Sequence, residues 1–294
     1  MKELLHPLQP DNAESIAAAA QKIPALTLTA RQDAIVEDVM SAGTMRIEDL
    51  ADRFNVSRMT IHRDIETLEA KAVLRRSRGS VTAIASSLFE ASIEYRNRQN
   101  RDEKDAIAAV AADLIEPGEA IILDDSTTGL RLVPYLSERE PLTVITNFGR
   151  MQRELEGRRG INLISTGGEY STVCDAYRGA LTLRALQGLA ADTYFLSAAA
   201  VTGDVCYHPH QDIVLAKQAM LQAAHRKILI VDHSKFSRRA LHAIAPISEF
   251  DIVIVDSNID PADLRRLRQS NVDVRIAQVS QVDADETSKH GLSA

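Results

Sequence analysis

From about residue 120 onward, short runs of β-branched and other apolar residues alternate with amphipathic segments of helical period. The runs are too short and too apolar for exposed strands, so they predict strands that are buried on both faces. They cover residues 120–123, 142–146, 161–165, 194–201, 227–231 and 251–255. An amphipathic segment over 101–115 precedes the first run and stops at Pro117-Gly118. The alternation predicts the α/β class, with a mostly parallel sheet covered by helices.

The first third of the chain follows a different pattern, because residues 27–85 are helical and then hairpin-like. We therefore expect two folded domains, which a length of 294 residues allows. A proline-containing stretch without apolar periodicity precedes them, and a polar tail follows them. The expected division is a flexible extension over 1–26, a winged helix-turn-helix over 27–86, an α/β effector-binding and oligomerisation domain over 87–280, and a disordered tail over 281–294.

Composition narrows the class of protein further. A chain with 45% hydrophobic and 26% charged residues lies in the globular range. No apolar run approaches the ~18 residues that a membrane span needs, and the first residues lack the pattern of a secretory signal. Cys174 and Cys206 are not in a paired spacing, which argues against a disulfide framework or a cysteine zinc site. We expect a soluble cytoplasmic protein that does not associate with membranes.

Three apolar stripes at helical spacing lie between residues 35 and 68. They are Ile35, Val36, Val39 and Met40; Ile47, Leu50, Ala51 and Phe54; and Ile61, Ile65 and Leu68. Three helices with such stripes can share one core. Ser57 is placed to cap the third helix by accepting a bond from a backbone N–H, and the link before it is as short as a helix-turn-helix requires. The third helix is then the recognition helix.

The outer face of this third helix suits the major groove of DNA. When the stripe faces inward, Thr60 and Arg63 face outward, and an arginine can bond guanine O6 and N7 together. Two β-type segments follow around a basic tip, which indicates a wing. Between Ser57 and Ser80 there are six basic and three acidic residues, opposite in sign to the net charge of −7, so we expect phosphate contacts here. The predicted DNA contacts are Ser57, Arg58, Met59, Thr60, His62, Arg63, Arg76 and Arg78.

A stripe of this kind alone is also compatible with a protein-interaction module whose arginines are only solvated. The capped helix, the short turn and the arginine-tipped hairpin occur together, however, and that combination favours double-stranded operator DNA as the partner. Asp64 lies at the flank of the buried stripe, so we expect it to pair with a nearby arginine and not with a base. Because one recognition helix reads only a few base pairs, we also expect a homo-oligomer, a dimer or higher.

In the second domain, polar residues follow several predicted strands. Hydroxyls and backbone N–H groups at the start of a helix bind anions, and parallel sheets bind their ligands at the carboxyl ends of strands. Lysines and an aspartate near these ends could hold phosphate or sugar hydroxyls. Alternatively, each Ser or Thr only caps the helix that follows. The candidate effector contacts are Asp124, Ser126, Thr127, Thr128, Asn147, Gly167, Gly168, Lys217, Asp232 and Lys235.

The motifs together resemble the DeoR family of bacterial sugar-metabolism regulators. They are the segment 56–65 (VSRMTIHRDI), Leu68-Glu69 and the tip 76–79, then Arg96, Asn100, Glu103-Lys104, Leu123-Asp124 with Thr127-Thr128, Thr146-Asn147, Thr166-Gly167-Gly168, Asp232 and Ser234-Lys235-Phe236. The resemblance covers about residues 29–258. It adds Lys104 to the candidate effector contacts. It implies a C-terminal domain similar to sugar-phosphate isomerases that binds a phosphorylated sugar and controls the DNA affinity of a repressor without turning the sugar over.

The chain departs from the pattern of that family at the pocket. Ser126 and Cys174 stand where glycine is usual, and the strand end after Phe195 reads Ser-Ala-Ala-Ala where glycines are usual. An added Cβ disfavours positive φ and restricts the approach of a ligand, so we expect a smaller or differently selective pocket.

Other functions are compatible with parts of the sequence. One is an isomerase-like or deacylase enzyme fused to a DNA-binding domain, with Asp124, Asp232 or Lys235 as acid–base groups; another is a regulator whose pocket serves only as a dimer surface. Cys206, His208, His210 and Asp212 alternate as metal ligands could, but Pro209 interrupts a regular strand. His233-Ser234 lacks the context of a catalytic nucleophile. We predict no catalytic residues, no metal and no cofactor.

Overall fold

The computed structural model describes residues 28–42, 44–70, 74–83, 93–172 and 174–279. The chain forms two compact units, Met1–Leu88 and Phe89–Ala294. The predicted extension over 1–26 and the predicted tail over 281–294 lie outside the described residues. None of the helices in the described ranges is long and apolar enough to cross a membrane.

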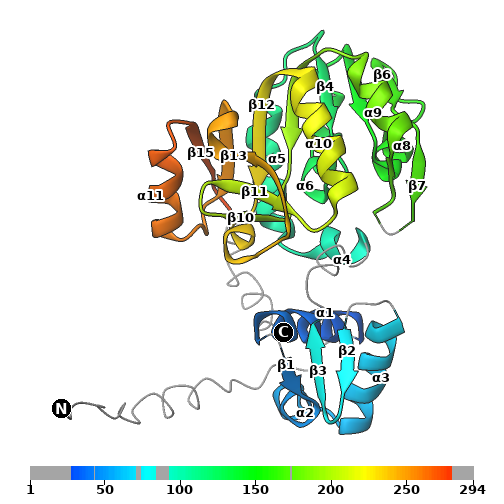
Figure 1. Ribbon diagram of the computed structural model, residues 1–294, viewed down its shortest axis with the longest axis vertical. Helices are drawn as coiled ribbons and strands as arrows, with labels where there is room; N and C mark the ends of the chain where they lie inside the picture. Colours follow the sequence, from blue (N-terminus) through cyan, green and yellow to red (C-terminus); the bar gives the residue numbers. More distant parts are fainter. Residues whose placement is uncertain (1–27, 43, 71–73, 84–92, 173, 280–294) are drawn as a thin grey trace, which may run out of the picture. The chain divides into compact units, whose positions relative to one another are not determined.

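The first unit is a winged helix-turn-helix (Figure 1). Its elements are α1 (Leu28–Ala42), β1 (Thr44–Arg46), α2 (Ile47–Phe54), α3 (Arg58–Ala70), β2 (Leu74–Ser77) and β3 (Ser80–Ala83), and its strands form an antiparallel sheet in the order β1-β3-β2. α2 ends at Asn55, whose φ of 50° is left-handed, and the backbone N–H of Thr60 donates a 3.2 Å hydrogen bond to Ser57 Oγ. Chain reversal and cap therefore lie within three residues, and the predicted helix-turn-helix is confirmed.

The core of this unit consists of the three predicted stripes. Every stripe residue whose side chain is described is buried, together with Leu74 and Val81 of the wing; the side chain of Met40 is not described. Asp64 is also buried, and its carboxylate accepts a 2.7 Å bond from Arg31 Nε and a 3.2 Å bond from Gln32 Nε2. The prediction that Asp64 pairs with an arginine is confirmed, and the pair ties α3 to α1.

The second unit is built on a seven-stranded parallel sheet in the order β15-β14-β12-β9-β4-β5-β6 (Figure 1). The strands are β4 (Ala120–Leu123), β5 (Leu142–Thr146), β6 (Ile161–Ser165), β9 (Ala191–Leu196), β12 (Ala224–Val231), β14 (Ile252–Asp256) and β15 (Asp273–Ala277). All six pairings are parallel. The predicted α/β class with a mostly parallel sheet is confirmed.

Helices cover both faces of this sheet. They are α4 (Ile93–Arg98), α5 (Arg101–Ala112), α6 (Thr127–Leu130), α7 (Val133–Leu136), α8 (Gly149–Leu155), α9 (Ala180–Gln187), α10 (Gln211–Ala223) and α11 (Pro261–Gln269). Alternate strand residues contribute to two separate hydrophobic clusters: Ile228 and Ile230 pack with α5, α7 and α8, whereas Leu229 and Val231 pack with α9, α10 and α11. Because side chains on a strand point to alternate faces, both faces are apolar, which explains the unbroken apolar runs of the sequence.

The run 194–201 is not one strand as predicted. β9 ends at Leu196, residues 197–199 turn away, and Ala200 begins β10 (Ala200–Thr202). β10 belongs to a second, antiparallel sheet with β11 (Val205–His208) and β13 (His242–Pro246). This sheet and the hairpin of β7 (Glu169–Ser171) and β8 (Ala176–Arg178) were not predicted. The small residues of 197–199 prolong a β-like run although the backbone has left the sheet there.

Candidate DNA-binding surface and ligand pocket

The recognition helix α3 presents a polar face. Arg58, Met59 and Arg63 are exposed, Thr60 and His62 are half-buried, and Met59 is 64% exposed. An apolar side chain that stands in solvent at the start of a recognition helix is suited to contact the methyl group of thymine. The orientation follows from the stripe, because burying Ile61, Ile65 and Leu68 leaves these residues on the opposite face.

The start of α3 and the tip of the wing enclose a basic hollow. It is lined by Arg46, Ile47, Glu48, Arg58, His62, Arg78, Gly79 and Ser80. Gly79, at φ 72°, allows the tight turn between β2 and β3 that brings Arg78 opposite the helix. Arg58 Nη1 lies 2.8 Å from Glu48, and Arg76 Nη1 lies 3.6 Å from Glu66, so both arginines have acidic neighbours in free protein. Arg46 also lines the hollow and was not predicted, although a basic residue directly before the first helix of the helix-turn-helix motif is a signal for it.

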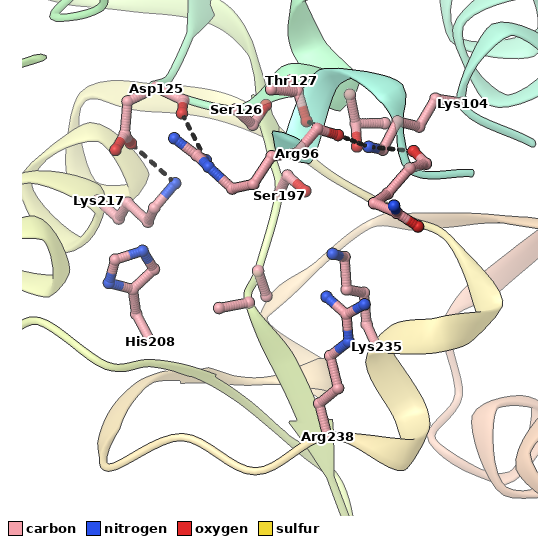
Figure 2. Close-up of a pocket in the computed structure, with 14 residues that line it drawn as sticks. Arg96, Lys104, Asp125, Ser126, Thr127, Ser197, His208, Lys217, Lys235 and Arg238 are labelled. Atoms are coloured by element: carbon pink, nitrogen blue, oxygen red, sulfur yellow. Dashed lines mark hydrogen bonds and ion pairs between the residues drawn. The ribbon is translucent and has the colours of Figure 1, made fainter. Parts of the chain in front are cut away.

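A pocket that could hold a ligand lies at the carboxyl ends of β4, β9 and β12 (Figure 2). Six of the predicted effector contacts line it: Lys104, Ser126, Thr127, Thr128, Lys217 and Lys235. The other lining residues are Arg96, Gln99, Asp125, Ser197, Ala198, Ala199, His208 and Arg238. None of these eight was among the candidate contacts, although the DeoR resemblance includes Arg96. They come from five separate stretches of chain, which only the fold brings together.

The remaining predicted contacts lie elsewhere. Asp124 and Asp232 are fully buried behind the lining. Asn147, Gly167 and Gly168 follow β5 and β6 and do not line the pocket. There, Asn147 donates a 3.1 Å hydrogen bond to the carbonyl of Tyr177, and Thr182 donates a 2.7 Å bond to the carbonyl of Gly167. These two strand ends hold β8 and α9 in place.

A buried charge network forms one wall of the pocket. Lys217 Nζ lies 2.6 Å from Asp124 Oδ2 and 3.3 Å from Asp125 Oδ1. Asp124 Oδ2 also accepts bonds from the hydroxyl of Tyr194 at 3.0 Å and the backbone N–H of Ser197 at 3.1 Å. Burial alone would lower the pKa of Lys217, but the two carboxylates outweigh it and the pKa is raised. Lys217 is therefore charged and already engaged.

Lys104 holds the segment that leads into α5. Lys104 is 2% exposed, and its Nζ donates to the carbonyls of Arg96 and of Gln99, the latter at 2.6 Å. Burial, followed by repulsion from Lys235, lowers the pKa of Lys104 to about 7. Thr127 Oγ1 donates a 3.3 Å bond to the same carbonyl of Arg96, so the pocket loop and the α4–α5 junction are joined directly.

Asp232 holds the segment that carries Lys235, on the side of the pocket opposite Lys217. Its carboxylate accepts bonds from the Asn100 amide at 2.8 Å and the Ser234 N–H at 3.1 Å, and Lys235 Nζ lies 3.6 Å away. Burial would raise the pKa of Asp232, but Lys235 and Lys104 lower it further than burial raises it. Asp232 is thus ionised and fixes the short 3₁₀ helix His233–Ser237 that carries Lys235.

Ser126 does not need the conformational freedom of glycine at its position. Ser126 has φ −99° and ψ 143°, an extended conformation that any residue adopts, so its Cβ causes no strain. Its hydroxyl accepts a 2.9 Å bond from the N–H of Gly129 and caps α6. A Cβ on Gly129 would lie 2.8 Å from that hydroxyl oxygen. Residues 197–200 also have no positive φ.

The cysteine, histidine and serine side chains that the sequence analysis considered as metal ligands or nucleophiles are engaged in packing or hydrogen bonds. Cys206 points into the core, where burial raises the pKa of its thiol to about 12. His208 lines the pocket, and its Nδ1 accepts a 3.2 Å bond from the backbone N–H of His210. Ser234 donates its hydroxyl to Asp232, and His233 Nδ1 lies 2.9 Å from Asp256. Within the described part of the chain, no group of three or more His, Cys, Asp or Glu side chains is arranged to hold a metal ion.

A helix-turn-helix with a basic wing, followed by an α/β domain with a cationic pocket, defines a DNA-binding regulator with a sensor domain. Residues 31–87 match the DeoR-like helix-turn-helix domain and residues 99–257 match the DeoR C terminal sensor domain. The chain therefore belongs to the DeoR family of transcriptional regulators, as the motifs had indicated.

Individual proteins show the same relationship. The chain is 34% identical to YulB of Bacillus subtilis, an uncharacterized HTH-type transcriptional regulator, over 85% of this chain and 97% of YulB. It is 28% identical to a putative aga operon transcriptional repressor of Escherichia coli O157:H7, over 83% of this chain and 92% of the repressor. Among solved structures it is similar to ribose 5-phosphate isomerase A of Methanocaldococcus jannaschii, with 17% identity, a TM-score of 0.35, and coverage of 47% of this chain and 55% of the isomerase.

Proposed function

We propose that the chain represses a carbohydrate-metabolism operon and loses affinity for its operator when a phosphorylated sugar occupies the pocket. The observation that carries this proposal is the gathering of Arg96, Lys104, Lys217, Lys235 and Arg238 around one pocket in the sensor domain. The similarity to a repressor named for the aga operon supports a carbohydrate-related target.

The charges of the pocket favour an anion. Five basic side chains line it, while Asp125 lines it and Asp124 and Asp232 lie behind it. With every group ionised, the site carries a net positive charge. Arginine and lysine are the usual partners of phosphate, and the hydroxyls of Thr127 and Thr128 supply neutral donors.

Binding without turnover fits the use of the acidic groups. An enzyme would need an acid–base pair placed over its substrate. Asp124 and Asp232 instead accept several bonds each and hold the scaffold of the pocket. Lys104 favours the alternative of an isomerase-like enzyme, because a lysine with a pKa of about 7 beside a pocket could transfer protons. Its two carbonyl partners assign it to positioning in this proposal.

Repression also implies an assembly and a location. A recognition helix reads only a few base pairs, so we infer a dimer or higher oligomer that reads a repeated operator. The named relatives are regulators of bacteria, where DNA lies in the cytoplasm, and we infer a cytoplasmic location for this chain as well.

The test combines operator binding with ligand binding. An operator duplex, selected from a random library with the full chain, is titrated by fluorescence anisotropy with and without a panel of free and phosphorylated sugars. We expect one or more phosphorylated sugars, and no free sugar, to weaken operator binding. Lys235→Ala should abolish this response, whereas Lys227→Ala, in the first half of β12 and away from its carboxyl end, should preserve it. Turnover of the sugar, or a response to free sugars only, would contradict the proposal.

A further inference from the structure

The pocket has two chemically different ends (Figure 2). Lys235 and Arg238 lie together on one side, whereas Asp125 and Lys217 lie on the other with His208 beside them. Arg96 reaches across the space between the two ends, and its Nη1 donates a 3.4 Å bond to the carbonyl of Asp125. A ligand that fills the pocket therefore meets two different kinds of group.

Asp125 is the acidic side chain that lines the pocket, and its carboxylate accepts fewer hydrogen bonds than it could. It is 2% exposed, and both of its carboxylate oxygens are buried without a hydrogen-bond donor in the part of the chain that the structure describes. Lys217 Nζ lies 3.3 Å from Oδ1 as an ion-pair partner, and this contact helps to raise the pKa of Lys217, but neither carboxylate oxygen accepts a well-formed hydrogen bond from the described residues. A buried carboxylate that has one ion-pair partner and accepts no well-formed hydrogen bond retains free lone pairs, so such a group in a pocket is suited to accept a hydrogen bond from a ligand.

The neighbouring carboxylate explains why Asp125 accepts no short hydrogen bond from Lys217. Asp124 Oδ2 takes the short bond from Lys217, together with the bonds from Tyr194 and Ser197. Two carboxylates thus share one lysine, and the better bond goes to the carboxylate that does not line the pocket. The lining carboxylate retains capacity to accept hydrogen bonds.

We propose that Asp125 accepts a hydrogen bond from a hydroxyl of the effector and so selects polyhydroxylated phosphates over simple phosphate esters. This inference rests on the proposed function, which places a phosphorylated sugar in the same pocket. The phosphate lies toward Lys235 and Arg238, and a hydroxyl at the far end of the ligand donates to Asp125. A hydroxyl suits this position better than an ammonium group, because the charged Lys217 repels a second cation.

The first test varies the ligand and uses the full-length wild-type chain. Calorimetry compares methyl phosphate with glycerol 3-phosphate, D-ribose 5-phosphate, D-fructose 6-phosphate and D-tagatose 6-phosphate. Since a hydrogen bond to a charged group contributes substantially, we expect at least one of the polyhydroxylated compounds to bind at least roughly tenfold more tightly than methyl phosphate. Equal binding of all five would overturn the role of Asp125 but leave phosphate recognition intact. Binding of none would overturn the proposed function and this inference with it.

The second test varies the protein. Asp125→Asn and Asp125→Ser remove the charge and keep a polar side chain, and Asp113→Asn, which removes an exposed carboxylate on the surface, is the matched control. We expect the advantage of the sugar phosphate over methyl phosphate to fall to roughly threefold or less in both variants and to persist in the control. Methyl phosphate should bind these variants as well as or better than wild type, because a negative charge has been removed, and that binding also reports a folded pocket. An undiminished advantage in either variant that binds methyl phosphate would overturn the proposal.

Discussion

The side-chain amide of Asn100 donates a 2.8 Å hydrogen bond to the carboxylate of Asp232, which lies 132 residues later in the chain. Asn100 immediately precedes α5, and Asp232 immediately follows β12. The bond therefore brings Lys104, one turn into α5, to the same pocket as Lys235. Asn100 has a φ of 48°, a left-handed conformation that asparagine tolerates better than most residues. The positions of Lys104 and Lys235 relative to each other are thus linked through the side-chain amide of Asn100.

Replacement of Arg63 should relax the choice of DNA sequence. Arg63 is exposed on α3, where it can bond a guanine, so Arg63→Ala should reduce the preference for operator over random duplex by on the order of 1–3 kcal/mol. Anisotropy titrations with both duplexes measure this difference. Thr67→Ala, one turn further along the same exposed face, is the control. Equal losses on both duplexes would show that Arg63 meets phosphate and not a base.

Replacement of the wing arginines should lower the affinity for DNA without changing the preference for the operator. Arg76→Ala and Arg78→Ala should weaken binding to operator and random duplex alike, because phosphate contacts carry no sequence information. For each variant the slope of log K against log salt should become shallower by about 1, since one fewer counterion is released. A loss confined to the operator would contradict phosphate contact.

Loss of the carboxylate of Asp64 should destabilise the DNA-binding unit. Asp64→Ala removes the acceptor for Arg31 and Gln32 in a buried site, so we expect a cost of roughly 1–3 kcal/mol in the free energy of unfolding. Hydrogen exchange of the full chain, resolved to α1 and α3, measures this change. The exposed Asp52 provides a matched control, because Asp52→Ala should change stability little. Unaltered exchange in Asp64→Ala would mean that the pair contributes no stability.

Anion binding should take up a proton near pH 8. Lys104 has a pKa of about 7 in the free protein against an ordinary 10.5, so above pH 7 it is mostly neutral, and a bound anion favours its charged form. Affinity should therefore fall as pH rises from 7 to 9, by about tenfold per unit at most. Sulfate does not titrate in this range and is the probe. Its binding enthalpy should depend on the ionisation enthalpy of the buffer in wild type and not in Lys104→Met; the same dependence in both would assign the proton to another group.

In the free protein, Lys104 should make the free energy of unfolding rise with pH. Because the pKa is lower in the folded chain than in the unfolded chain, the unfolded chain binds more protons between about pH 7 and 10.5. This group therefore makes the free energy of unfolding rise with pH across that window. Denaturant titrations of wild type and Lys104→Met at pH 7 and pH 9 should show a larger rise in wild type, and an equal rise would contradict the lowered pKa.

Operator recognition should require more than one copy of the chain. Sedimentation velocity of the full chain should show a dimer or larger, and the selected operator should contain two half-sites about one helical turn, or a multiple of it, apart. A monomer bound to an operator without a repeat would contradict this prediction. Deleting one half-site is the matched control and should weaken binding strongly.

The sequence predicted the framework because burial leaves a direct pattern. The run at 142–146 coincides with β5, whose residues are mostly buried, since strands covered on both faces carry apolar residues at successive positions. The run at 161–165 coincides with β6, but β6 is the edge strand and none of its residues is fully buried, so the expected burial was wrong there. The stripe Ile61, Ile65 and Leu68 likewise fixes which face of α3 is outward, because one helix can bury only one face against this core.

The pocket was predicted less completely, because its composition depends on the order of the strands. Asn147 and Gly167 end strands at the correct edge, but β5 and β6 lie one and two strands beyond β4, roughly 5 and 10 Å away. Arg238 and His208 enter the pocket from the 3₁₀ region and from the antiparallel sheet, whose pairing local periodicity does not reveal. Apolar runs identify the strands and the edge of the sheet where their carboxyl ends lie. They do not reveal the strand order, which decides which of these ends are neighbours.

The side chains that fit at positions 126 and 129 depend on each other. The hydroxyl of Ser126 occupies the space that a side chain at position 129 would need, and it caps the N–H of the same residue. A lineage that gains a side chain at position 129 must displace that hydroxyl, and one that replaces Ser126 with glycine frees the space but loses the cap. A substitution at one of these positions changes which side chains fit at the other. We therefore expect positions 126 and 129 to covary among sequences that share the pocket.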